Sequence, residues 1–163
     1  MATINGDDSD NTLYGTAEVI DYIYGFGGND IIYGYFYLSA PGADFMYGGT
    51  GNDLYYVAST DDIVYENAGE GDEDEVNAFI NYTLPANVEG LWLYNASIIG
   101  TGNELNNWIN GNDNDNMLYA LAGSDTILGE AGNDIMHGAD GDDTFWAGTG
   151  NDIVYGDADK DKL

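Results

Sequence analysis

The chain has 163 residues, of which 30 are acidic and 2 are basic, so its formal net charge is −28. This balance excludes nucleic acid as a partner, because phosphate binding requires Lys and Arg and the chain has only Lys160 and Lys162. High net charge is typical of disordered chains, but 44% of the residues are hydrophobic and 13% are aromatic, which is enough for a packed core. We therefore expect that folding requires a cationic partner that neutralises the acidic side chains.

The sequence excludes three further features. No apolar run approaches the ~20 residues that span a bilayer, so no transmembrane segment is expected. The N-terminal stretch MATINGDDSD has neither the basic nor the apolar region of a Sec-type signal peptide. The chain has no cysteine, which excludes disulfide bonds and thiolate metal sites.

In chain order, an Asp or Asn recurs with a step of nine residues, and we call each of these positions a slot. Two steps differ: the step from Asn11 to Asp21 is ten, and the step from Asp30 to Asp44 is fourteen. The longer step contains five inserted residues within 34–43, where Pro41 indicates a turn. The slots are Asn11, Asp21, Asp30, Asp44, Asp53 and Asp62, and then Asn107, Asn116, Asp125, Asp134, Asp143, Asp152 and Asp161.

Each slot predicts one tight turn followed by one short strand. The residue two after the slot is apolar, and the three residues after the slot fit the out, in, out alternation of a strand. Glycines before the slot permit the turn. Two nonapeptides then make one coil of eighteen residues, and successive coils stack through parallel strands. The predicted inward residues are Leu13, Ile23, Ile32, Met46, Tyr55, Val64, Ile109, Leu118, Ile127, Met136, Phe145, Val154 and Leu163.

We expect one all-β domain over 1–163, a right-handed parallel β-roll or β-helix solenoid. It divides into a first repeat block (1–65), an irregular β spacer (66–106) and a second repeat block (107–163). In the spacer, apolar alternation over 78–84 and 91–94 indicates strands. Asp74 followed by Val76 resembles an isolated slot, and the acidic run 70–75 indicates a solvated loop.

The turns favour a hard divalent cation as the neutralising partner. Such an ion takes six to eight oxygen ligands at roughly 2.3–2.6 Å, which turn carbonyls and slot carboxylates supply. Stacking brings slots eighteen apart together, so Asp125, Asp143 and Asp161 share one edge and Asp134 and Asp152 the other. We expect several Ca²⁺ ions rather than Mg²⁺, which resists dehydration. The alternative is that Asp and Asn only cap their own turns.

The candidate metal residues are the slot aspartates of these turns and the glycines before them: Gly25, Gly27, Gly28, Asp30, Asp44, Gly48, Gly49, Gly51, Asp53, Asp62, Gly123, Asp125, Gly129, Gly132, Asp134, Gly138, Gly141, Asp143, Gly148, Gly150, Asp152 and Asp161. Asn11, Asn107 and Asn116 lack the charge, and the turn VASTD before Asp62 lacks glycine.

The stretch GGTGNDLYY, at 48–56, resembles the G-G-x-G-x-D-x-U-x nonapeptide of RTX (repeats-in-toxin) proteins. Near-copies lie at 25–33, 129–137 and 138–146, and the spacer resembles segments found between RTX blocks in secreted bacterial proteins. The resemblance implies a Ca²⁺-binding β-roll that is exported by a type I secretion machinery. It also implies disorder in the low-calcium cytoplasm and folding outside the cell.

The outward positions indicate self-association as a second property. Most residues one and three after the slots are apolar or aromatic. Contiguous exposed apolar patches usually mark an interface. Neither end of the sequence has a polar cap of the kind that solenoids need. The alternatives are a stabilising aromatic ladder, a fragment of a longer chain, or edge protection by the two lysines. The predicted interface residues are Ile31, Tyr33, Phe45, Tyr47, Leu54, Tyr56, Ile63, Tyr65, Ile135, Ile153 and Tyr155.

No catalytic residue is predicted. His137 is the only histidine and no nucleophile motif accompanies it, while identical repeated acids favour a repeated structural role. We therefore expect a secreted, non-enzymatic structural protein that assembles into extracellular filaments or a surface layer. The alternative is a calcium-dependent secretion, folding or binding module of a larger RTX enzyme or adhesin. An ice or carbohydrate binder would need a long regular array, which the insertions at 34–43 and 66–106 disfavour.

Overall fold

A computed structural model describes residues 1–16, 20–34 and 42–163. These residues form strands β1 to β17 and contain no helix, and the strand pairs within each unit are parallel. The predicted all-β parallel solenoid is confirmed. The described ranges therefore include no helix that is long and apolar enough to cross a membrane. Most of the insertion at 34–43, with the turn expected at Pro41, lies outside the described residues.

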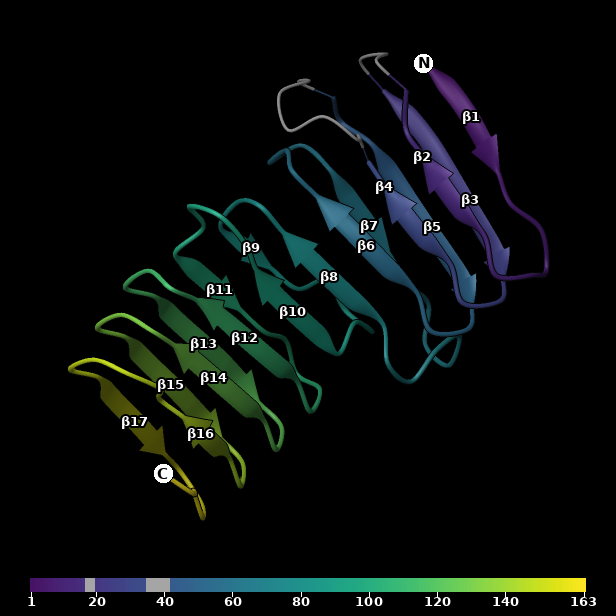
Figure 1. The fold of residues 1–163 in the computed structure, drawn as a ribbon. Helices are drawn as coiled ribbons and strands as arrows, with labels where there is room; N and C mark the ends of the chain where they lie inside the picture. The colour runs from purple at the N-terminus through teal and green to yellow at the C-terminus, as the bar shows by residue number, and fades with distance from the viewer. Residues whose placement is uncertain (17–19, 35–41) are drawn as a thin grey trace. The chain divides into compact units, whose positions relative to one another are not determined.

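The first of two compact units comprises Met1–Phe79 and Pro85–Val88. Its strands alternate between two parallel sheets, with the orders β1-β3-β5-β7 and β2-β4-β6-β8, and Figure 1 shows this alternation. Each coil thus places one strand in each sheet. The strands are β1 (Ala2–Asn5), β2 (Thr12–Tyr14), β3 (Asp21–Gly27), β4 (Ile31–Tyr33), β5 (Phe45–Thr50), β6 (Leu54–Val57), β7 (Ile63–Tyr65) and β8 (Glu75–Ala78).

The second unit comprises Ile80–Leu84 and Glu89–Leu163. It has the same construction, with the strand orders β10-β12-β14-β16 and β9-β11-β13-β15-β17. Its strands are β9 (Tyr82–Thr83), β10 (Gly90–Leu93), β11 (Ile99–Thr101), β12 (Trp108–Asn112), β13 (Met117–Ala122), β14 (Thr126–Glu130), β15 (Ile135–Asp140), β16 (Thr144–Trp146) and β17 (Ile153–Asp157).

Strand register follows the slot spacing. In the second unit, Ile109 pairs with Ile127 and Ile127 with Phe145, so each coil advances eighteen residues. In the first unit, Ile23 pairs with Met46, an advance of twenty-three. The five inserted residues therefore leave the inward side chains in register, because the extra length is confined to the connection between β4 and β5.

The core of each unit is the column of inward residues. Eleven of the thirteen predicted inward residues are at most 8% exposed, and the three-residue strands β2, β4, β7 and β16 bury only their middle side chain. The prediction is wrong for Val154, which is half-buried, and for Leu163, which is 85% exposed. β17 is the edge strand of its sheet, so no further strand covers Val154.

The spacer forms short strands in both units. Leu91 and Leu93 are buried in β10 while Trp92 is half-buried, as their alternation predicts. The single strand expected over 78–84 is wrong. β8 ends at Ala78, and the chain leaves the first unit after Phe79 and forms only the two-residue β9 in the second.

Candidate functional site

The slot carboxylates form hydrogen-bonded ladders along the edges of each unit. In the second unit, the backbone N–H of Asp125 donates to Oδ1 of Asp143 at 2.8 Å, and that of Asp143 donates to Oδ1 of Asp161 at 3.1 Å. On the other edge, Asp134 N–H donates to Oδ1 of Asp152 at 3.0 Å. The structure therefore brings together the slots that are eighteen residues apart.

The first unit has two equivalent ladders. On one edge, Asp21 N–H donates to Oδ1 of Asp44 at 2.9 Å, and Asp44 N–H donates to Oδ1 of Asp62 at 3.3 Å. On the other edge, Asp30 N–H donates to Asp53 at 2.7 Å, and Asp53 N–H donates to Asp74 at 2.8 Å. The ladders thus include two residues outside the predicted set, Asp21 and Asp74.

A second set of hydrogen bonds runs beside these ladders in the opposite direction. The residue just before a slot donates its N–H to the side chain of the corresponding residue one coil earlier. Examples are Asn52 to Asn29 at 2.9 Å and Asn133 to Asp115 at 2.7 Å. Sequence analysis missed this set, although the recurring Asn-Asp pair before and at the slot was its signal.

Two classes of slot differ in whether the second side-chain oxygen accepts a hydrogen bond from the slot's own turn. Asp21 and Asp62 direct this oxygen to N–H groups of their own turns, at Thr16 and Ser59, and the slot amides Asn11 and Asn116 close their turns in the same way. Within the described part of the chain, five slots instead have a buried Oδ2 that accepts no hydrogen bond: Asp30, Asp53, Asp125, Asp134 and Asp143. The capping alternative thus describes the first class and not the second.

The glycine five residues before a slot makes room for its carboxylate. A Cβ on Gly48 would lie 2.0 Å from Oδ2 of Asp53, and one on Gly138 would lie 2.1 Å from Oδ2 of Asp143. Gly25 and Gly129 are similar, with Cβ positions 2.0 Å and 2.5 Å from the Oδ2 atoms of their slots. These glycines shape a space into which the carboxylate points.

The remaining turn glycines have other roles. Positive φ angles occur two and four residues before the slots, at Gly28, Gly49, Gly51, Gly123, Gly132, Gly141, Gly148 and Gly150. Gly27 belongs to neither group, and its Cβ would lie 2.9 Å from Oγ1 of Thr50. Some turns use non-glycine residues in the left-handed region, among them Phe26, Leu121 and Glu130, which costs about 1–2 kcal/mol each.

Burial raises the pKa of seven slot carboxyls. Removal from water raises the pKa of Asp53 and of Asp125 to about 7, and that of Asp44 to about 6. The same cause raises the pKa values of Asp30, Asp62, Asp134 and Asp143. Neighbouring carboxylates on the ladders add to the effect. Without a cation, the ionised ladders oppose folding at neutral pH.

Two acidic residues outside the predicted set lie beside Asp53. These are Asp74 and Glu66, and ligand oxygens of the three carboxylates lie within 4.8 Å of one another. Burial raises the pKa of Glu66 to about 8. Asp74 had a sequence signal, the Asp-x-apolar pattern with Val76, whereas Glu66 lies outside any slot.

The donor set fits Ca²⁺. Every candidate side chain presents oxygen, and the unpartnered Oδ2 atoms of Asp30, Asp53, Asp134 and Asp143 lie where a Cβ on the preceding glycine would stand. Hard cations with flexible coordination prefer such ligands. The chemistry of the turns therefore suits a hard divalent cation such as Ca²⁺.

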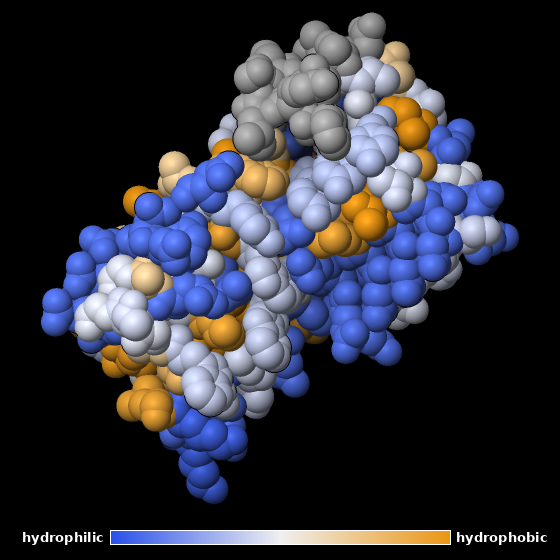
Figure 2. Space-filling view, viewed as in Figure 1, coloured by the Kyte–Doolittle hydropathy of each residue, from blue (hydrophilic) through white to orange (hydrophobic). Residues whose placement is uncertain are grey.

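The solvent exposure of the predicted interface residues depends on where their strands lie in the sheet. Ile63, Tyr65, Ile153 and Tyr155 are 38–47% exposed, because β7 and β17 are edge strands. The other seven lie on interior strands and are half-buried by their neighbours. On the face seen in Figure 2, apolar residues (orange) form separate patches between hydrophilic residues (blue).

The outward aromatic residues stack across strands. Tyr33 lies between Tyr14 and Tyr56, with ring centroids 4.8 Å and 4.2 Å apart. His137 lies between Tyr119 and Tyr155, at 5.1 Å and 4.5 Å. The aromatic-ladder interpretation of these positions agrees with this geometry.

Together, the parallel coils and the carboxylate ladders define a repeat solenoid whose turns are built to hold cations. The chain matches the RTX calcium-binding nonapeptide repeat over residues 3–18, 20–36, 40–64, 101–136 and 128–163. These segments cover more than half of its length, and the chain belongs to this family, as its resemblance predicted.

One curated relative is the endo-1,3-1,4-beta-glycanase ExsH of Rhizobium meliloti (strain 1021). It is 42% identical to the chain over 57 residues, which make up 35% of this chain and 12% of the glycanase. The similarity therefore concerns a small part of a much longer protein.

Proposed function

We propose that the chain is an extracellular, non-enzymatic solenoid that folds when Ca²⁺ binds to its turns. The observation that carries this proposal is the set of five buried slot oxygens that accept no hydrogen bond from the described residues. Burying ionised carboxylates without a partner is strongly unfavourable. Bound Ca²⁺ supplies the positive charge that makes their burial favourable.

The residues proposed to hold the ions are the slot aspartates and turn backbones of both blocks. The five slots with an unpartnered oxygen in the described ranges are the strongest candidates, and Asp44, Asp62, Asp152 and Asp161 complete the ladders next to them. The glycines five residues before Asp30, Asp53, Asp134 and Asp143 keep the space open. The other candidate glycines shape the turn and direct its carbonyl oxygens.

Circular dichroism in EDTA and in millimolar Ca²⁺ tests this proposal. We expect little β structure in EDTA and a cooperative gain with Ca²⁺, because neutralisation and stacking occur together. Mg²⁺ at the same concentration is the control for ionic strength, and it should produce a much smaller gain. A chain that is fully folded in EDTA would contradict the proposal.

We further propose that folded chains self-associate into filaments or a surface layer. The support is the exposed apolar and aromatic side chains on β7 and β17, namely Ile63, Tyr65, Ile153 and Tyr155. Light scattering and negative-stain electron microscopy with and without Ca²⁺ test it. Replacing Ile63 and Ile153 by Thr or Ser should reduce assembly and leave the circular dichroism spectrum unchanged. If the wild-type chain forms only monomers in Ca²⁺, self-association is contradicted.

Export is part of the same proposal. Family membership supports a type I secretion route and a location outside the cell, where Ca²⁺ is abundant. Secretion of the chain from a host with and without a type I exporter, followed by blotting of the medium, tests this route. Retention in the cell in both hosts would argue against it.

A second candidate function is a calcium-dependent module of a larger secreted enzyme. The observation in its favour is the match to a short part of a glycanase. The chain itself should then release no sugar from mixed-linkage glucan, while a longer reading frame would encode a separate catalytic domain. Glucan hydrolysis by this chain would contradict the non-enzymatic assignment.

A further inference from the structure

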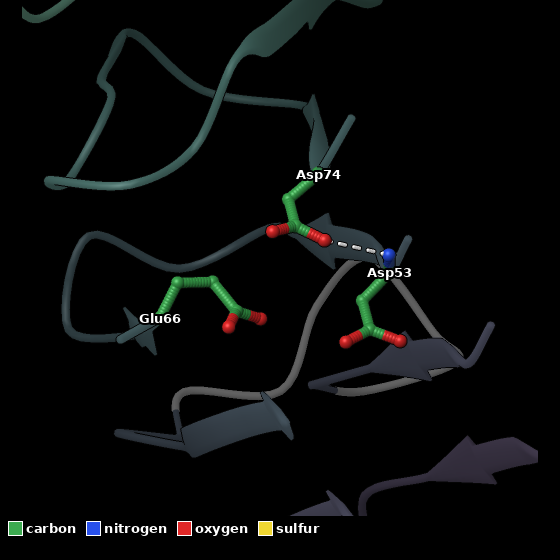
Figure 3. A group of neighbouring side chains, drawn as sticks. All are labelled: Asp53, Glu66 and Asp74. Atoms are coloured by element: carbon green, nitrogen blue, oxygen red, sulfur yellow. Dashed lines mark hydrogen bonds between the residues drawn. The ribbon is translucent and has the colours of Figure 1, made fainter. Parts of the chain in front are cut away.

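Three carboxylates from two successive coils converge inside the first unit. Asp53 immediately precedes β6, Glu66 follows β7, and Asp74 immediately precedes β8. Ligand oxygens of all three lie within 4.8 Å of one another. In Figure 3, the carboxyl groups point into the same space, and Oδ1 of Asp74 accepts a hydrogen bond from the backbone N–H of Asp53.

All three side chains are withdrawn from solvent. Asp53 and Asp74 are each 1% exposed, and Glu66 is 9% exposed. Within the described ranges, Oδ2 of Asp53 and Oε2 of Glu66 are buried and accept no hydrogen bond. Two of the three converging carboxylates therefore each have a buried oxygen without a hydrogen-bond donor among the described residues.

Tyr55 orients one side of this space. Its ring fills the core position two after slot Asp53, where the other inward residues are aliphatic, Met or Phe. Its hydroxyl donates a hydrogen bond to Oε1 of Glu66, whereas Oε2 of Glu66 is buried and accepts no hydrogen bond from the described residues. A Cβ on Gly48 would lie 2.3 Å from this hydroxyl and 2.0 Å from Oδ2 of Asp53, so a glycine is required above the cluster.

The sequence of the first unit contains no Lys, Arg or His that could neutralise this cluster. Lys160 and Lys162 are the chain's only basic residues apart from His137, and all three belong to the second unit. Three ionised carboxylates in a buried space repel one another strongly. An external cation is the remaining source of positive charge.

We propose that Asp53, Glu66 and Asp74 form a buried site for a hard divalent cation of the Ca²⁺ type, in addition to the turn sites. Oxygens that share one Ca²⁺ at about 2.3–2.6 Å lie at most about 4.6–5.2 Å apart, which agrees with the observed spacing. Glu66 and Asp74 lie in the stretch 65–100, which the repeat family does not match. The site is therefore a feature of this chain beyond the nonapeptide pattern. It rests on the proposed function only in sharing Asp53 and Asp74 with a turn ladder.

Native mass spectrometry of the full chain in Ca²⁺ tests the site. The variant Glu66→Gln keeps the shape and removes the charge, and it should bind one Ca²⁺ fewer than the wild type. The matched control is Glu73→Gln, which removes an exposed carboxylate beside Asp74 and should keep the wild-type number. An unchanged number in Glu66→Gln would overturn the site, as would a wild type that binds no Ca²⁺, which would also end the proposed function.

A crystal structure of the wild-type chain grown in Ca²⁺ keeps the test independent of any variant. The site predicts calcium density within about 2.3–2.6 Å of oxygens from Asp53, Glu66 and Asp74. Calcium in the turns together with a direct hydrogen bond between Glu66 and either aspartate would overturn this site. That outcome would leave the proposed function intact.

Discussion

The backbone N–H of Asp125 donates to Oδ1 of Asp143, while Oδ2 of Asp143 is buried and accepts no hydrogen bond from any described residue. The two oxygens of this carboxylate thus have separate roles: Oδ1 joins neighbouring coils, and Oδ2 is available to bind a cation. The two roles are separable by mutation.

Asp143→Asn should retain the coil-to-coil hydrogen bond and lose the charge. We expect the Ca²⁺ midpoint of folding, followed by circular dichroism, to rise by about tenfold or more, since ligand charge sets affinity. Asp143→Ala should in addition destabilise the Ca²⁺-saturated protein by about 1–3 kcal/mol, because Asp125 N–H loses its acceptor. Asp113→Asn, which removes an exposed charge in the same unit, should leave the midpoint unchanged.

The ion-free chain should gain stability on acidification. Burial raises the folded-state pKa values of Asp53 and Asp125 to about 7 from an ordinary 3.8. The folded state therefore binds more protons than the unfolded state between these values, and stability falls as pH rises through this window. In EDTA, β structure measured by circular dichroism should be greater at pH 5 than at pH 8.

Calcium should reverse this pH dependence, because protons compete with the ion for the same oxygens. In millimolar Ca²⁺, the melting temperature should fall on going from pH 8 to pH 5. In EDTA, the double variant Asp53→Asn, Asp125→Asn should show a smaller difference in β structure between pH 5 and pH 8 than the wild type. If the variant and the wild type respond equally, general charge repulsion rather than these two carboxyls controls the response.

Gly48→Ala should destabilise the first unit. The new methyl group would lie 2.0 Å from Oδ2 of Asp53 and 2.3 Å from the hydroxyl of Tyr55, so both must move. We expect a loss of about 1–3 kcal/mol in chemical unfolding and weaker Ca²⁺ binding. Gly69→Ala is the control, because nothing lies within 4 Å of its Cβ and only its φ of +82° opposes the change. Equal losses in both variants, without weaker Ca²⁺ binding in Gly48→Ala, would contradict the steric argument.

Leu121→Gly should stabilise the second unit. Leu121 has a φ of 83° and is 40% exposed, so the variant relieves backbone strain and removes little packing. Left-handed strain of about 1–2 kcal/mol exceeds the entropic cost of glycine, about 0.5–1 kcal/mol. The melting temperature in Ca²⁺ should rise by a few degrees. Leu128→Gly, on β14, the next strand along the chain, should lower it instead.

The repeated features of the fold could be predicted from the sequence because they depend on spacing alone. A step of eighteen identifies Asp125 and Asp143 as neighbours, and a period of two identifies Ile127 as a core residue. The alternation over 78–84 wrongly predicted a single strand, because whether such a segment forms one strand depends on its tertiary contacts. Ile80 follows the point at which the chain leaves the first unit, so the segment cannot continue as one strand.

Other features of the site were not visible in the sequence. All turn glycines looked equivalent, but Gly48 makes room for a carboxylate whereas Gly49 adopts a positive φ. Glu66 approaches Asp53 through a connection of irregular length, and no fixed spacing indicates such a contact. Leu121 and Glu130 occupy left-handed positions that their residue types disfavour, so only the backbone reveals them.

The two opposed sets of turn hydrogen bonds make the mechanical coupling between coils reciprocal. A slot residue such as Asp134 relies on the following coil for its acceptor, whereas the preceding residue Asn133 relies on the coil before it. Removing a coil from either end therefore leaves a backbone N–H of the remaining coil without its hydrogen-bond acceptor. Neither direction offers an easier route for unravelling, and each unit should resist stepwise fraying and come apart as a whole.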